Sequence, residues 1–124
     1  MLETRRMRAR DMAEQAKYVL PRFYGEVVVK DGRDIGSVSI VWMPDKRPFL
    51  CLQITDELRK CPVFLVKIGR RFIAAAMEAE GRLFTLEDKD EPTSRRFLEF
   101  LGFTPTGETL EGERVLTWQR SSHS

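Results

Sequence analysis

The chain has few of the residues that carry metal or nucleophilic chemistry. Its 124 residues include one histidine and two cysteines. The histidine, His123, is next to last in the sequence, so neither a Ser-His triad nor a histidine metal cluster is expected. Cys51 falls in an apolar strand and Cys61 just before a helix, which indicates two buried, reduced thiols rather than a disulfide framework. We therefore expect no metal site.

Long apolar runs and an excess of one charge are also missing. Apolar runs such as residues 49–52 and 63–66 are only a handful of residues long and too short to cross a membrane, and no apolar stretch follows the N-terminal arginines as it would in a secretory signal. The 21 basic and 19 acidic residues leave a net charge of +2. Arginines do gather in clusters, at Arg5, Arg6, Arg8, Arg10, Arg70, Arg71, Arg95 and Arg96. With so balanced a total, nucleic-acid binding is not expected.

The first half of the sequence predicts an antiparallel sheet. Aromatic and β-branched residues over 23–30 and alternating apolar residues over 35–43 predict two strands. Between them, Asp31 and Gly32 both tolerate the positive φ of a tight hairpin turn. Residues 49–54 are apolar almost throughout, which is typical of a central strand covered on both faces.

The second half predicts a parallel connection. Pro62 suits the first turn of a helix that runs to about Glu80, with Gly81 as its C-cap. Phe64, Ile68 and Phe72, together with Leu65, Ile73 and Met77, form the stripe that this helix is expected to bury. Residues 83–86 form the next strand, so residues 49–54 and 83–86 should be parallel, with the helix crossing between them.

The remaining segments complete one domain over residues 1–120, followed by a tail at 121–124. The expected elements are a weak strand at 2–7, a helix at 10–20 ended by Pro21, a loop or short helical turn at 55–60, a helix from Pro92 or Thr93 to Gly102, and an antiparallel pair at 103–109 and 113–119. The order is β-α-β-β-β-α-β-α-β-β. The fold class is α/β, with a single mixed sheet and helices on both faces.

This order resembles the GNAT fold of N-acetyltransferases. The run SRRFLEFLGF at 94–103 resembles the family's late helix and the glycine-phenylalanine that opens its next strand. The stretch from Arg47 to Trp118 also resembles small GNAT-related proteins of podophages and prophages, of the internal virion protein A type. The resemblance to GNAT enzymes implies a cytoplasmic protein. The resemblance to phage proteins implies a protein of the host cytoplasm or of the virion.

The resemblance implies an acetyl-CoA site after the central strand, at Leu52, Ile54, Arg59 and Lys60. Enzymes of this fold bind the pyrophosphate with a glycine-rich loop at a helix N-terminus. Here no glycine occurs between the strand and Gly69, Asp56 and Glu57 would repel phosphate, and Pro62 lacks a backbone donor. We therefore expect acetyl-CoA to bind weakly or not at all.

The catalytic positions that the resemblance implies are also altered. The family's late-helix tyrosine, which protonates the leaving thiolate, corresponds to Leu98, and a common asparagine corresponds to Glu91. Weak catalytic candidates are Glu91, as one of the acids in the loop at 87–91, and Tyr24.

Three hypotheses follow. The chain is a non-catalytic GNAT-fold protein that acts through contacts with other proteins, such as virion components. Alternatively, it is a divergent acyl-CoA-dependent N-acetyltransferase. The third hypothesis, a nucleic-acid-associated module, depends on the arginine clusters alone. We favour the first because the glycine loop and the tyrosine are both missing.

Overall fold

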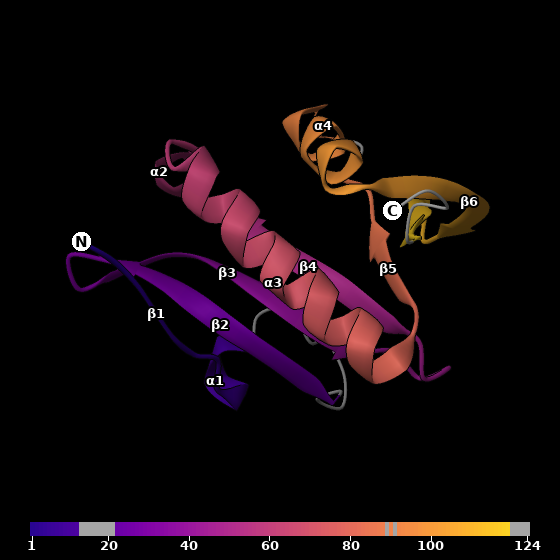
Figure 1. Ribbon diagram of the computed structural model, residues 1–124, viewed down its shortest axis with the longest axis horizontal. Helices are drawn as coiled ribbons and strands as arrows, with labels where there is room; N and C mark the ends of the chain where they lie inside the picture. The colour runs from indigo at the N-terminus through magenta and orange to yellow at the C-terminus, as the bar shows by residue number, and fades with distance from the viewer. Residues whose placement is uncertain (13–21, 89, 91, 120–124) are drawn as a thin grey trace.

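The computed structural model describes residues 1–12, 22–88, 90 and 92–119, which form one mixed seven-stranded sheet (Figure 1). The elements in chain order are β1 (Leu2–Arg6), α1 (Ala9–Met12), β2 (Phe23–Lys30), β3 (Arg33–Trp42), β4 (Pro48–Ile54), α2 (Asp56–Arg59), α3 (Pro62–Glu80), β5 (Leu83–Leu86), α4 (Pro92–Leu101), β6 (Phe103–Leu110) and β7 (Glu113–Trp118). The strands lie in the order β1-β2-β3-β4-β5-β7-β6. The predicted element order is confirmed, and the segment after β4 is the short helical alternative. The rest of the helix predicted at 10–20 lies outside the described residues.

Tight turns set the register of the N-terminal half. Strands β1 to β4 pair antiparallel in sequence order. Asp31 and Gly32 join β2 to β3 with φ values of 51° and 80°, the left-handed backbone that the sequence predicts at this hairpin. Successive side chains of a strand point to opposite faces of the sheet. This register therefore places the main core on the α3 side and a smaller cluster of Met7, Val27 and Val41 on the other side.

The parallel connection is also confirmed. Strand β4 pairs parallel with β5 at Phe49↔Phe84 and Leu50↔Thr85. In Figure 1, α3 lies diagonally across β3 and β4, between the end of β4 and the start of β5. The pairing extends no further than these two positions, so the strands diverge toward their C-terminal ends.

Helix α3 packs on the sheet along one apolar stripe. Pro62 opens the helix, and Gly81 closes it with a φ of 72° and an N–H that donates to the Met77 carbonyl at 2.9 Å. The buried stripe consists of Leu65, Ile68, Gly69, Phe72, Ile73 and Ala76. Phe64, predicted to belong to it, is only half-buried because Leu65 takes the inward position in the first turn.

Helix α4 packs on the same side as α3, and Gly69 of α3 leaves room there for Leu101 of α4. A β-carbon on Gly69 would lie 3.3 Å from Leu101 Cδ1, tighter than an ordinary contact. Helix α1 lies on the opposite face, where Arg10 and Asp11 border a hollow with Val27 and Gln53. Helices therefore cover both faces, as predicted. None of the described helices combines the length and the apolar character needed to span a membrane.

Phe72 tests this core. Its side chain is 2% exposed, and its ring lies 5.6 Å from the ring of Tyr24. We expect Phe72→Ala to lower the free energy of unfolding by about 3–5 kcal/mol, because the substitution removes a large buried side chain and leaves a cavity. The measurement is urea unfolding followed by circular dichroism.

Phe100→Ala is the matched control, because Phe100 is 63% exposed and loses little burial. Its side chain makes one cation–π contact, with the Arg70 guanidinium 5.6 Å from the ring centroid. We expect a loss of about 1 kcal/mol or less. Equal losses in the two variants would contradict the assigned core.

Candidate functional site

A pocket of about 450 Å³ lies where β4 and β5 separate. Its apolar lining consists of Met43, Phe49, Leu50, Leu52, Ile54, Pro62, Leu65, Val66, Leu86, Phe97 and Leu98. Its polar lining consists of Cys51, Arg59, Thr85, Asp88 and Ser94. The two strands, the first turns of α3 and the body of α4 therefore enclose one predominantly apolar site with a few polar groups, which is typical of small-molecule sites.

The edge of β4 that faces the pocket carries backbone groups without a strand partner. The Thr85 hydroxyl donates to the Leu50 carbonyl at 2.7 Å, so that carbonyl is turned toward β5. Backbone groups of alternate residues in a strand point to the same side, so those of Leu52 and Ile54 are turned the same way. Among the described strands, none pairs with β4 on this side beyond Leu50. The pocket therefore contains a row of peptide donors and acceptors.

Three of the residues predicted for the acetyl-CoA site come together here. Leu52, Ile54 and Arg59 line the pocket, whereas Lys60 is exposed at the end of α2 and does not. Tyr24 lies on β2, in contact with Phe72, and is not among the pocket-lining residues. Glu91 lies outside the described residues.

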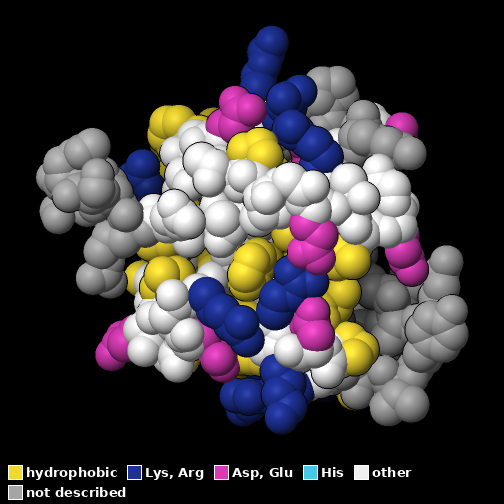
Figure 2. All heavy atoms as spheres, turned by 90° about the vertical axis from the view of Figure 1, so that its right-hand side faces the viewer, with side chains coloured by type: hydrophobic (Ala, Val, Ile, Leu, Met, Phe, Trp, Pro, Cys, Tyr) yellow, Lys and Arg dark blue, Asp and Glu magenta, His cyan; other side chains and the backbone are white. Residues whose placement is uncertain are grey.

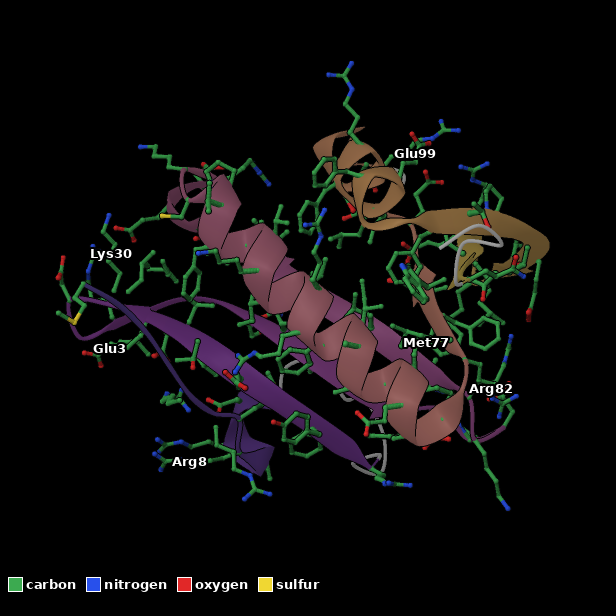
Figure 3. All side chains as sticks on the ribbon, in the orientation of Figure 1. Glu3, Arg8, Lys30, Met77, Arg82 and Glu99 are labelled. Carbon is green, nitrogen blue, oxygen red and sulfur yellow. The ribbon has the colours of Figure 1, made fainter. Side chains whose placement is uncertain are left out.

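The acidic residues after β4 are held by neighbouring cations. Glu57 pairs with Arg33 at 2.9 Å and with Lys30 at 4.0 Å; Figure 3 shows Lys30 at the far end of β2, at the opposite side of the molecule from α4. Asp56 is 93% exposed and pairs with Arg59 at 2.8 Å. Each of the two carboxylates therefore has a cationic partner, which weakens the repulsion of phosphate that the sequence predicts here.

The same segment is fixed by a helix cap. The Thr55 hydroxyl donates to the Ile35 carbonyl at 2.6 Å and accepts the Leu58 N–H at 3.2 Å. Helix α3 has no such cap, because its N-cap residue Cys61 makes no side-chain hydrogen bond to the first turn. Pro62 at the first helical position lacks a donor that the helix would leave unused in any case. The next backbone N–H groups of the helix still point toward its N-terminal end.

A buried carboxylate lies at the end of β5, and the sequence did not predict its structural role. Glu87 follows β5 and is 7% exposed. Its oxygens accept from Arg114 of β7 at 2.6 and 3.1 Å, and one of them lies 3.2 Å from Arg95 of α4. The hydrogen bonds from Arg114 lower the pKa of Glu87. Glu87 thus holds the end of β5 to β7 and α4, and is committed to a structural ion pair.

The sequence offered only a weak signal for this ion pair. Glu87 directly follows an apolar strand, but it also begins an acidic loop whose members look alike. Its partner Arg114 is 27 residues away, on a strand whose register cannot be read from composition. Asp88, the neighbouring acid, lines the pocket and accepts the Asp90 N–H at 2.9 Å.

The position that the resemblance assigns to a tyrosine supplies no acid. Leu98 is 1% exposed and lines the pocket, where it has no proton to give. The Cys51 thiol also lines the pocket, and burial raises its pKa to about 11, so it is neutral near pH 7. Both cysteines are free and half-buried rather than fully buried. Within the described part of the chain, no three metal-ligating side chains gather closely enough to hold an ion.

Arginines from each of the clusters noted in the sequence take part in ion pairs. Arg5 binds Asp11 and Asp34, both at 2.9 Å, and Arg71 binds Glu26 at 2.6 Å. On the face shown in Figure 2, basic and acidic side chains likewise lie beside one another, around exposed apolar side chains.

Comparison with solved structures shows which fold this is. The chain is similar to an IAA acetyltransferase from Bacillus cereus, with a TM-score of 0.68 and 14% identity, covering 95% of this chain and 99% of that one. It is similar to the N-acetyltransferase PseH from Campylobacter jejuni in complex with acetyl coenzyme A, with a TM-score of 0.61 and 11% identity, covering 98% and 100%. It is also similar to the GNAT domain of S. lividans PAT, with a TM-score of 0.61 and 14% identity, covering 90% and 69%. No family model and no curated protein matches the sequence.

The chain therefore has the GNAT fold, as the sequence resemblance predicted. The interpretation as a non-catalytic virion protein is wrong, because the structures with this fold that resemble the chain are acetyltransferases. They give no support to a virion role or to a phage-protein subgroup. The gap between β4 and β5 is present without a glycine-rich loop, so the absence of the loop does not imply the absence of a site.

The Glu87 ion pair yields a stability prediction. We expect Glu87→Gln to lower the free energy of unfolding by about 1–3 kcal/mol, since it weakens charged hydrogen bonds to two elements. Partial exposure of the two arginines favours the lower end of that range. Glu99→Gln is the control, because Glu99 also pairs with Arg95, at 3.3 Å, but is 59% exposed. Figure 3 shows Glu99 on the side of α4 turned away from α3. We expect its loss to stay within about 0.5 kcal/mol.

The difference in unfolding free energy between the wild type and Glu87→Gln should depend on pH. Because the folded-state pKa of Glu87 lies below its ordinary value of 4.5, its contribution is fully present above that value. It is lost as the pH falls through the lowered folded-state pKa. Urea unfolding at pH 7 and in the acid range measures this, and a gap between wild type and Glu87→Gln that persists when Glu87 is protonated would refute the assignment.

Proposed function

We propose that the chain is an acyl-CoA-dependent N-acyltransferase, whose donor binds in the pocket between β4 and β5. The observation that carries the proposal is the early end of the β4–β5 pairing, which leaves an apolar pocket beside an unpaired strand edge in a GNAT fold. One structural neighbour, PseH, is in complex with acetyl coenzyme A.

The unpaired edge of β4 suits the amide-bearing arm of coenzyme A. Leu52 and Ile54 present peptide N–H and C=O groups to the pocket, and an extended chain with amide groups can pair with such an edge as an added strand does. Their half-buried side chains, with Leu65 and Phe97, supply an apolar wall for the methylene groups of the arm. Main-chain pairing requires no particular side chain, so this part of the site does not depend on a sequence motif.

The phosphate groups of the donor are assigned to the first turn of α3. The uncapped N–H groups after Pro62 lie at the positive end of a 19-residue helix. Arg59 lines the pocket beside this end and supplies a guanidinium. Lys60 is one residue further along but lies outside the pocket lining.

Bound acyl-CoA supplies an activated acyl group: an amine nitrogen forms a bond to the thioester carbonyl carbon, the C–S bond breaks, and coenzyme A leaves as its thiol. The described residues of this chain contribute mainly by orientation and by excluding water around the reacting groups. Asp88 is the acidic side chain of the pocket lining, and we assign it the attraction of a cationic amine and the acceptance of its proton. Leu98 excludes a tyrosine-type acid at its position.

Binding of acetyl-CoA tests the proposal. We expect isothermal titration calorimetry with acetyl-CoA and CoA to give a Kd of about 1–100 μM, within the range usual for enzyme substrates and tighter than the weak or absent binding expected from the sequence alone. Arg59→Ala should weaken binding about five- to ten-fold, because it removes a charge beside the assigned phosphate position and leaves Asp56 without its cation.

Lys60→Ala is the matched control, since it removes an equal charge one residue away from the pocket lining. We expect a change of about two-fold or less, of the size that a screened surface charge produces. Absence of binding at millimolar acetyl-CoA would sink the proposal. Equal losses in the two variants would show that overall charge, rather than the pocket, attracts the donor.

A further inference from the structure

The pocket has one lining on the α3 face of the sheet and a second on the opposite face. Leu50 and Leu52 belong to or pack against the core under α3. Because side chains alternate along a strand, Phe49 and Cys51 point to the other face, and Cys51 packs there against the cluster of Met7, Val27 and Val41. Residues of both sets line the same pocket. The opening between β4 and β5 therefore passes from one face of the sheet to the other.

The end on the opposite face, which we call the far end, is formed by Met43, Phe49, Cys51 and Leu86. Met43 packs against the same cluster as Cys51, and Leu86 shares the face of Phe84, whose ring stacks on Phe49 at 5.6 Å. None of these four side chains is charged, and three of them, Met43, Cys51 and Leu86, are only half-buried. The charged lining residues, Arg59 and Asp88, instead follow the C-terminal ends of β4 and β5.

We propose that the acyl group transferred by this protein is a neutral straight chain longer than acetyl, of about four to six carbons, whose methylene groups occupy the far end. This inference rests on the proposed function. An acetyl group would contribute one methyl to this space and leave the half-buried apolar surfaces in contact with water. Each added methylene that becomes buried strengthens binding about four-fold, equivalent to about 0.8 kcal/mol. The basic side chain beside the stacked rings is Arg47, whose guanidinium lies 5.3 Å from the centre of the Phe49 ring and 5.1 Å from that of Phe84. It already pairs with Asp45 and Glu108, so a chain that ends in a carboxylate would have to compete with two acidic side chains for it.

Calorimetry on the wild-type protein with a series of donors tests the inference. The donors are CoA and its acetyl, butyryl, hexanoyl and succinyl thioesters. We expect butyryl-CoA to bind about ten-fold more tightly than acetyl-CoA, somewhat less than the roughly sixteen-fold that complete burial of two added methylene groups would give. Hexanoyl-CoA should bind at least as tightly as butyryl-CoA, and succinyl-CoA no more tightly than acetyl-CoA.

A substitution at the far end tests where the chain lies. Cys51→Leu adds bulk to the far end and should reduce the ratio of acetyl-CoA to butyryl-CoA dissociation constants from about ten to below about three. The same substitution at Cys61, which is not among the pocket-lining residues, should leave this ratio near ten. Leu86→Phe tests the same end from β5, so the inference can still be tested if Cys51→Leu fails to fold.

The outcomes separate this inference from the proposed function. If none of the thioesters nor CoA binds, the proposed function fails and the inference fails with it. If CoA and acetyl-CoA bind but longer chains bind equally or more weakly, the inference is overturned and the proposed function stands. Tighter binding of butyryl-CoA whose ratio is unchanged by both Cys51→Leu and Leu86→Phe would also overturn it, because the chain would then lie elsewhere.

Discussion

The two-residue parallel contact between β4 and β5 is the feature on which the rest of the site depends. Parallel strands joined by a crossing helix ordinarily pair along their length, yet here the ladder stops at Leu50 and Thr85. The Thr85 hydroxyl takes the place of the next ladder bond by donating to the Leu50 carbonyl at 2.7 Å. The last carbonyl before the strands part is thereby satisfied. Beyond this point the β4 edge is available to a ligand.

Each wall of the gap is held from its own side. Strand β4 stays in register with β3 as far as Gly36↔Ile54, and the Thr55 hydroxyl binds the Ile35 carbonyl just beyond. Strand β5 is drawn the other way by its pairing with β7, which continues through the Glu87 ion pair with Arg114. Since one wall is fixed to β3 and the other to β7, the opening is built into the sheet and does not require a ligand to separate the strands.

Local chemistry explains which parts of the fold could be predicted. The Asp31-Gly32 turn, the proline start and glycine end of α3, and the apolar β4 each carry a signal within a few residues, and all were confirmed. The burial of Phe64 could not be read in the same way, because neighbouring Leu65 competes for the inward position. For the site, Leu52, Ile54 and Arg59 line the pocket, because they belong to the strand and the turn after it. That they bind a cofactor stays a prediction.

The long-range ion pairs explain what could not be predicted. Glu57 looked like a repulsive charge because its partners, Lys30 and Arg33, lie on an earlier hairpin. Glu87 looked like one acid of a solvated loop because Arg114 lies on the last strand. In both cases the sequence identifies the acidic residue but not its basic partner, because only the pairing of the strands brings the partner close. Lys60 differs from these two residues. It was predicted to belong to the acetyl-CoA site because it is basic, but it lies at the end of α2 and does not line the pocket.

Backbone donors for a phosphate group do not require a glycine-rich loop. A glycine-rich loop lets backbone donors approach a phosphate closely, but donors are also present wherever a helix begins without a side-chain cap. Helix α3 begins in this way at Cys61 and Pro62, directly beside the gap between the strands. A strand edge, a helix end and one arginine therefore surround an apolar pocket here without that motif. If the proposed donor binds in this pocket, the absence of a glycine-rich loop reduces close backbone approach to its phosphates, and the apolar contacts of its acyl chain make up a larger share of the binding free energy.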